Sequence, residues 1–395
     1  MDDHAREISS DPLTFPIFRG GPFYRLQERL GLVRAGKRRL GGCVIYLVLV
    51  AWVPMAILAA LQGLALGPTR LESFLMDFEV NIRLLVSIPA FLLAEVFCER
   101  LLRLVVQQFL LARVVTQAAR ARFEALVRDI VRLSHSGKAE TVVLGLAYLQ
   151  CVIPVVFFVE LPEATWRLSV REGHHTLSLA GWWYFLVAFP IYSFLFWRWL
   201  WRLGLWWRFL WQTSRLDLQL TPAHRDGAGG LGFLSESLGA FGGFAFAVTA
   251  TAVGGFADLV VYEGQSPLDY KWELGGVMAL LLILIVGPIF LFVMRLYEAK
   301  EHAKFRYGEL ASHQIQQVEQ KWLSNEAWRE DAGTDYWAVA HLGSSVTAVH
   351  AMSIIPLYKD DIFVLLLAIL LPIVPLLAVL IPMEQVLAIL LKVLA

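Results

Sequence analysis

The feature that most constrains this chain is a series of seven apolar blocks, each about as long as the roughly 20-residue helix that crosses a bilayer. They cover residues 43–63, 82–102, 141–161, 178–200, 236–258, 274–296 and 361–383. The blocks are continuous rather than alternating, which favours helices over the strands of a membrane barrel. The sequence therefore predicts an all-α, polytopic membrane protein with about seven transmembrane helices.

Composition agrees with this class. Hydrophobic residues make up 57% of the chain and charged residues only 17%, whereas soluble domains carry about 25% charged residues. The formal net charge is zero, which gives no support for a nucleic-acid partner. Cys43, Cys98 and Cys151 are far apart and lack metal-type spacing, so they are interpreted as packing residues. No metal ion or cofactor is expected.

Basic residues indicate the orientation. Lysine and arginine gather before the first block and after the second, fourth and sixth, while the intervening loops are relatively acidic. Because basic loops stay in the cytoplasm, this alternation predicts a cytoplasmic N-terminus. The first residues, MDDHAREISSDPLTF, are polar and acidic, unlike a cleavable signal peptide.

The chain divides into four expected segments. The first, 1–41, is cytoplasmic and contains an interfacial helix. The second, 42–297, is a six-helix transmembrane region with cytoplasmic loops 103–140 and 201–235. A cytoplasmic helical segment, 298–360, precedes a C-terminal transmembrane helix and tail, 361–395.

Two spans are expected to extend into the cytoplasm as helices. Neither proline nor glycine follows the second span until Gly137, so that helix could continue almost to this residue. After the sixth span, small and apolar positions recur at three- and four-residue spacing, which predicts a narrow seam for one partner helix. These positions are Gly308, Ala311, Ile315, Val318 and Trp322.

The stretch Thr221–Leu234, TPAHRDGAGGLGFL, is a candidate site at the start of the fifth span. A helix N-terminus attracts anions, and glycines let backbone amides approach a ligand. An anion or lipid headgroup could therefore bind here, or His224 and Asp226 could act in catalysis. The alternative is that Asp226 simply caps backbone amides. The candidate ligand-binding residues are His224, Arg225, Asp226, Gly227, Gly229 and Gly230.

A stripe of small residues runs along the fifth span at exact four-residue steps. Small residues let membrane helices pack closely, so this span is expected to be central, either pressed against another helix or lining a narrow path. The stripe consists of Ser235, Gly239, Gly243, Ala247, Thr251 and Gly255.

Ionisable residues lie inside or beside other spans. Glu95 and Glu99 share one face of the second span, and a charge at such depth usually faces protein or a water-filled cavity. They could line a permeation path or pair with arginines at the inner interface. Arg198 and Arg295, at inner ends of spans, are interpreted as side chains that reach out to the membrane surface.

Three stretches resemble a group of uncharacterised bacterial inner-membrane proteins that share the motif H-x-D-x-x-G-G-L-G-F-L. They are AHRDGAGGLGFL, FRYGELASHQIQQVEQKWL and the terminal run that begins IIPLYKDDIF. Arg225 stands where proline is usual in that group. The resemblance covers roughly 200–395 and implies a multi-pass location in the bacterial inner membrane, without any known activity.

These patterns favour a channel or transporter for a small ion or solute, oligomeric, with the glycine-rich fifth span at its centre. The expected partners are the lipid bilayer, further copies of the chain and an anionic ligand or lipid headgroup at 221–234. One alternative is a membrane scaffold or sensor that displays cytoplasmic helices to partners. Another is a membrane-surface enzyme that uses His224 and Asp226.

Overall fold

The computed structural model describes residues 15–16, 20–29, 31, 33–34, 37–38, 40–67, 69, 71–158, 165–171, 174–323 and 332–378. This portion is mainly helical, with two short antiparallel hairpins, β1 (Val33–Arg34) with β2 (Lys37–Arg38) and β3 (Leu168–Arg171) with β4 (His174–Leu177). The α-helices are α2 (Gly21–Arg29), α3 (Leu40–Leu61), α4 (Phe78–Ile82), α5 (Ile88–Leu111), α6 (Gln117–Ser134), α7 (Gly137–Phe158), α8 (Leu179–Trp183), α9 (Phe189–Thr213), α10 (Glu236–Glu263), α11 (Lys271–Val286), α12 (Val293–Leu323), α13 (Ala332–Ala351), α14 (Lys359–Leu370) and α15 (Ile373–Ala378).

Shorter helical turns join several of these helices without a break. Two are π-helical, η1 (Arg83–Ser87) before α5 and η2 (Tyr184–Ala188) before α9. Three are 3₁₀ turns, η3 (Gly232–Ser235), η4 (Pro267–Tyr270) and η5 (Gly287–Phe292). Pro267 stands at the start of η4, where a missing N–H is tolerated. The prolines near the start of α5, α9 and η5 lie inside continuous helices, beside the π and 3₁₀ turns that interrupt the regular hydrogen-bond pattern.

Five helical stretches of the described chain are long and apolar enough to cross a membrane. They are Gly41–Leu61, Phe78–Leu111, Leu179–Thr213, Gly232–Glu263 and Pro267–Gln320. They match the first, second, fourth, fifth and sixth expected spans, so the all-α class and the apolar spanning helices are supported. The expected third span overlaps α7. The seventh overlaps α14 and α15, and its last residues, 379–383, lie outside the described residues.

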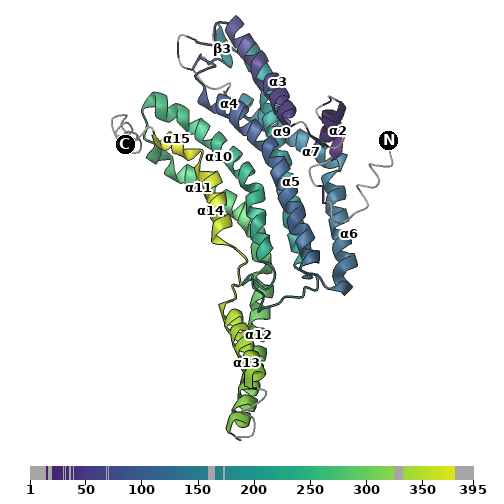
Figure 1. Cartoon of the computed structure of the whole chain (residues 1–395). Helices are drawn as coiled ribbons and strands as arrows, with labels where there is room; N and C mark the ends of the chain where they lie inside the picture. The colour runs from purple at the N-terminus through teal and green to yellow at the C-terminus, as the bar shows by residue number, and fades with distance from the viewer. Residues whose placement is uncertain are drawn as a thin grey trace.

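Helix α10 is the packing centre of the body. It contacts α4, η1 and α5 on one side and α11, α14 and α15 on the other (Figure 1). Elsewhere in the body, α7 packs against α9, and α3 packs against α5 and α8. Aromatic rings fill the space between α5, α9 and α10. Trp199, for example, stacks on Phe244 at 5.6 Å between ring centroids and meets Phe241 edge to face. Such pairs add dispersion and fix the helix positions.

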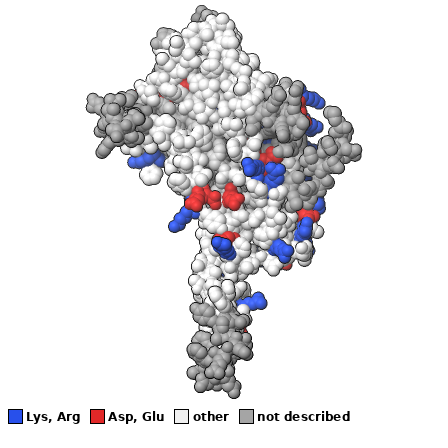
Figure 2. Space-filling model, viewed as in Figure 1, with Lys and Arg blue, Asp and Glu red and all other residues white. Residues whose placement is uncertain are grey.

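Helices α12 and α13 form a hairpin that projects from the body (Figure 1). On the face shown in Figure 2, most charged side chains gather around the lower part of the body, close to where this hairpin begins, and the surface above is largely free of charge. The long extension of the sixth span is thus confirmed as helix. It packs on α13 of the same chain. Of the expected seam, Val318 is buried and Gly308 and Ala311 are half-buried, whereas Ile315 is 45% exposed.

The expected extension of the second span is wrong. Helix α5 ends at Leu111, and Arg113 adopts a positive φ of 54° that turns the chain. Val115 then pairs with Leu218, and the Thr116 side chain caps α6 by accepting a hydrogen bond from the Ala119 amide at 3.2 Å. The absence of proline and glycine therefore did not mean one continuous helix. The residue that indicates the start of a new helix is Thr116, an N-cap residue.

Candidate functional site

The glycine-rich motif forms a closed turn around the Asp226 carboxylate. Its Oδ1 accepts hydrogen bonds from the amides of Ala228 and Gly230 at 2.9 and 3.1 Å, and its Oδ2 accepts one from the Gly232 amide at 2.9 Å. His224 places Nδ1 2.9 Å from the same Oδ1. The amides that an external anion would need are thus bonded to the chain's own carboxylate, as the capping alternative expects.

The glycines of this motif serve backbone geometry. Gly227, Gly229 and Gly230 all have positive φ values, which side-chain-bearing residues rarely adopt. At Gly232, an added Cβ would collide with the Tyr358 hydroxyl. That hydroxyl donates a hydrogen bond to the Asp226 carbonyl at 3.0 Å, so the motif also anchors the segment that leads into α14.

The pKa of Asp226 is lowered. Burial alone would raise it, but the amides of Ala228, Gly232 and Gly230, together with His224, favour the ionised carboxylate and outweigh burial. Arg225, the remaining candidate of the motif, is exposed to solvent. The motif is therefore a rigid turn held by an ionised aspartate.

Most of the small-residue stripe faces α4, η1 and α5, whereas Ser235 Oγ accepts a hydrogen bond from the Tyr358 amide at 2.9 Å. An added Cβ at Gly243 would collide with the Ala94 side chain, and one at Gly239 would just touch Leu101 at 3.9 Å. The Thr251 hydroxyl donates to Ser87 Oγ at 2.9 Å, and Gly255 approaches Glu79. The stripe lets α10 approach α5 closely, as expected of small residues in membrane helices.

Glu95 lies at the centre of a buried ion-pair cluster. It is 0% exposed, and its Oε1 accepts hydrogen bonds from Arg198 at 2.5 Å and Arg202 at 3.1 Å. Glu140 adds a second carboxylate, 3.9 Å from Arg198 Nε. Two acids and two arginines therefore balance within the bundle, which offsets the cost of burying each charge. Glu99, the other acid of this face, is half-buried.

The interpretation of Arg198 as a surface anchor is wrong, because this residue is only 2% exposed. It stands one turn before Arg202 on α9, and both side chains turn inward to Glu95. Arg295 is exposed, as expected. No sequence pattern identifies which arginines, more than a hundred positions away, pair with Glu95.

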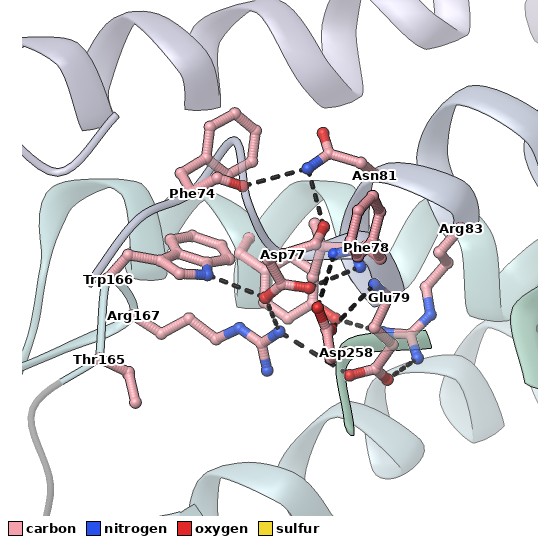
Figure 3. Close-up of polar contacts among 12 residues, drawn as sticks. Phe74, Asp77, Phe78, Glu79, Asn81, Arg83, Thr165, Trp166, Arg167 and Asp258 are labelled. Carbon is pink, nitrogen blue, oxygen red and sulfur yellow. Dashed lines mark hydrogen bonds and ion pairs between the residues drawn. The ribbon is translucent and has the colours of Figure 1, made fainter. Parts of the chain in front are cut away.

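A second charged cluster lies around Asp77, at the start of α4 and ahead of α5, and sequence reasoning missed it (Figure 3). Asp77 accepts hydrogen bonds from the Trp166 indole at 2.9 Å, from Arg167 at 2.5 Å and from the Val80 amide at 2.8 Å. The last bond caps α4. Burial would raise the pKa of Asp77, but Arg167 and these donors lower it below its usual value.

Further acids complete this cluster around Asp77. Asp258, from α10, accepts from the amides of Phe78 and Glu79 at 3.2 and 3.3 Å (Figure 3). Glu79 pairs with Arg83 one turn later, and Arg83 also donates to the Tyr184 hydroxyl at 2.5 Å. These bonds tie the starts of the α5 and α9 helices to α10. The acidic residues of the loops between apolar blocks are the sequence feature that points to this cluster. In the sequence they indicate only the orientation of the spans in the membrane.

A cavity of about 340 Å³ opens beside this cluster. Its charged lining consists of Asp77, Glu79, Asp258, Glu263 and Arg167, so acids exceed basic residues by four to one, and Trp166 and Phe185 contribute aromatic surface.

Among the described residues, no group of three or more His, Cys, Asp or Glu side chains is placed to hold a metal ion. His174 and His175 begin β4, but their side chains lie outside the described part.

Comparison with protein families, curated proteins and solved structures finds no match for this chain. The structure itself defines the class: a helical protein with five described stretches that are long and apolar enough to span a membrane.

Proposed function

We propose that this chain is a multi-pass protein of the bacterial inner membrane that carries a small organic cation across it. The proposed topology has seven spans, with α7 as the third and α14–α15 within the seventh. The N-terminus, the loops 103–140 and 201–235 and the segment 298–360 are placed in the cytoplasm. The basic residues of these segments support this orientation, and the family resemblance supports the inner membrane.

The cavity beside Asp77 carries the proposal. In this topology it lies at the external ends of spans, and its acidic lining attracts cations. Aromatic rings beside carboxylates suit an ammonium or guanidinium ion, which combines hydrogen bonding with attraction to ring faces. The volume of about 340 Å³ falls within the range of about 300–1,000 Å³ for small-molecule sites.

The cavity already holds one guanidinium, that of Arg167. Its Nη2 donates to Asp77 at 2.5 Å, and its Cζ lies 5.1 Å from the ring centroids of both Trp166 and Tyr184. A substrate with the same chemistry would compete with Arg167 for these groups. Such competition offers a way to couple binding to a local rearrangement at η1 and η2, since π-helical turns often mark functional positions.

Uptake into proteoliposomes tests the proposal. Radiolabelled guanidinium and methylammonium are the probes, with empty liposomes as background. Glu263 lines the cavity without capping α4, so Glu263→Gln should keep the fold and reduce uptake at low substrate concentration several-fold. Glu273→Gln, at an exposed acid on α11 outside the cavity lining, is the matched control and should leave uptake unchanged. Uptake no faster than into empty liposomes for both cations would overturn the proposal.

The α12–α13 hairpin supports a second candidate function, a scaffold that joins copies of the chain. Phe305, Leu310 and Ile315 of α12 are 78%, 51% and 45% exposed, and groups of exposed large apolar residues commonly mark contact sites. Native mass spectra of the detergent-purified protein test this. A dimer or larger ring that Phe305→Ser dissociates supports the scaffold, and a monomer at all concentrations rules it out.

A further inference from the structure

A second cavity lies on the other side of the bundle, between α2, α3, α7 and α9. Its volume is about 470 Å³, and most of its lining is apolar, including Leu47, Leu144, Leu186 and Ile191. Leu144 and Leu186 are also partly exposed at the outer surface of the bundle. The cavity therefore opens sideways beside α3 and α9, which belong to stretches that are apolar enough to cross a membrane, toward the place where lipid chains would lie.

The carboxylate of Glu140 gives this cavity one polar end. The side chain is buried, its Oε2 accepts a hydrogen bond from the Phe23 amide at 2.8 Å, and Phe23 and Pro22 of α2 line the same cavity. Since a carboxylate can accept about four hydrogen bonds, Glu140 retains capacity for a donor from the cavity. The lining thus combines a long apolar wall with one carboxylate, whose Oε1 lies 3.9 Å from Arg198 Nε of the buried ion-pair cluster.

The polar end favours an ammonium group, because an ammonium makes charge-assisted hydrogen bonds to a carboxylate. Lys138 and Arg25 are exposed on α7 and α2, but neither belongs to the lining. The single carboxylate in an apolar cavity therefore complements a headgroup with an amine at its end.

Gly21 allows the start of α2 to lie directly against Glu140, at the polar end of the cavity. Gly21 has a φ of 85°, and an added Cβ would collide with Glu140. The ring of Phe23 lies 4.7 Å from Arg198 Cζ, which connects α2 to the buried ion-pair cluster. The cavity is thus a built space between α2 and the apolar helices, with its polar end at a defined position.

We infer that this cavity binds one aminophospholipid of the surrounding bilayer, with an acyl chain along α7 and α9 and its ammonium group on Glu140. Eight positions separate Glu140 from Tyr148 along the lining of α7, so the apolar wall extends about 12 Å from the polar end at the 1.5 Å rise of a helix. This length accommodates part of an acyl chain. The site is independent of cation transport.

Lipid retention tests this inference. The protein is equilibrated in micelles that contain equal amounts of dioleoyl phosphatidylethanolamine, phosphatidylcholine and phosphatidylglycerol, and then examined by native mass spectrometry. The wild type should retain one phosphatidylethanolamine per chain, at several-fold higher occupancy than either other lipid. Equal retention of the three headgroups would overturn the assignment.

Two pairs of proteins separate the parts of the site. Leu144→Trp should fill the cavity and remove the bound lipid, whereas Leu149→Trp, at an exposed position of the same helix outside the lining, should retain it. Equal retention by these two variants would contradict the cavity. Glu140→Gln, compared with the wild type, should lose the headgroup preference, and an unchanged preference would refute the role of the carboxylate.

Discussion

Single carboxylates organise much of this chain. Asp226 closes a loop of glycines, Asp77 and Asp258 cap the same short helix α4, and Glu95 joins two arginines of α9. Each accepts several hydrogen bonds, so each connects segments that the sequence separates. Because buried amides without an acceptor are costly, these residues affect the fold more strongly than their number suggests.

Replacement of Asp226 should destabilise the protein. Asp226→Ala removes the acceptors of three amides, and lost caps and unsatisfied amides typically cost about 1–3 kcal/mol. We expect a clear decrease in the midpoint of thermal unfolding in detergent. Glu309→Ala, at an exposed acid of α12, is the control. Equal unfolding midpoints for Asp226→Ala and this control would show that the turn does not depend on Asp226.

The contribution of Asp226 should also depend on pH. Its pKa in the folded protein is below the ordinary value of 3.8, so the ionised form is favoured by folding. Its stabilisation is therefore present above pH 3.8 and is lost as the pH falls through the lower folded pKa. The difference in melting midpoint between wild type and Asp226→Asn should be present at pH 5 and decrease as the pH falls below about 4. A difference that grew as the pH fell below about 4 would contradict this sign.

Residue patterns predicted roles better than partners. The sequence indicated that Asp226 could cap amides and that Glu95 could pair with arginines, because both follow from local chemistry. It could not identify Arg198 and Arg202, since helix packing determines which distant side chains meet. The cluster around Asp77 was not predicted for the same reason. Asp77, Arg167 and Asp258 come from three separate segments that only the folded chain brings together.

At the scale of elements, the contact between α5 and α10 depends on the size of particular glycines. Gly243→Ala places a methyl group against Ala94, where the space is too small, and should destabilise the protein by about 1–3 kcal/mol. Gly239→Ala is the matched control, because its Cβ would lie at an ordinary 3.9 Å from Leu101. Alanine favours helix over glycine by about 1 kcal/mol, so this control should be neutral or stabilising. Equal melting midpoints for the two variants would exclude close packing at Gly243.

Helical elements were predictable where their apolar pattern was long, and less so at their ends. The extension of α12 followed from its composition and spacing. Its partner α13 did not, because the seam between Gly308 and Trp322 indicates that a helix packs there without specifying which one. The end of α5 was missed because Thr116 competes with an otherwise helical sequence, and a cap is a weaker signal than glycine or proline.

At the scale of the whole molecule, the structure constrains which loops share a side of the membrane. The turn at Arg113 and the segment that follows α9 are joined by the Val115–Leu218 pair. The hairpin α12–α13 leaves the body near that end, since Ser353 donates a backbone hydrogen bond to Gly227 at 2.7 Å. These segments therefore lie together, whereas the loop between α10 and η4 lies at the far end of α10 (Figure 1).

Cysteine labelling tests the proposed orientation of these ends. The three native cysteines are buried and form no disulfide among the described residues, so they are replaced by alanine. Single cysteines are introduced as Gln265→Cys, Gln219→Cys and Ser344→Cys, all at exposed positions. With the N-terminus inside, a membrane-impermeant maleimide should label position 265 in intact spheroplasts. Positions 219 and 344 should react only after permeabilisation. The reverse pattern would place the acidic cavity on the cytoplasmic side, and cation entry from outside would no longer begin there. Labelling of 219 and 344 on different sides would instead contradict the packing of the hairpin beside the glycine-rich turn.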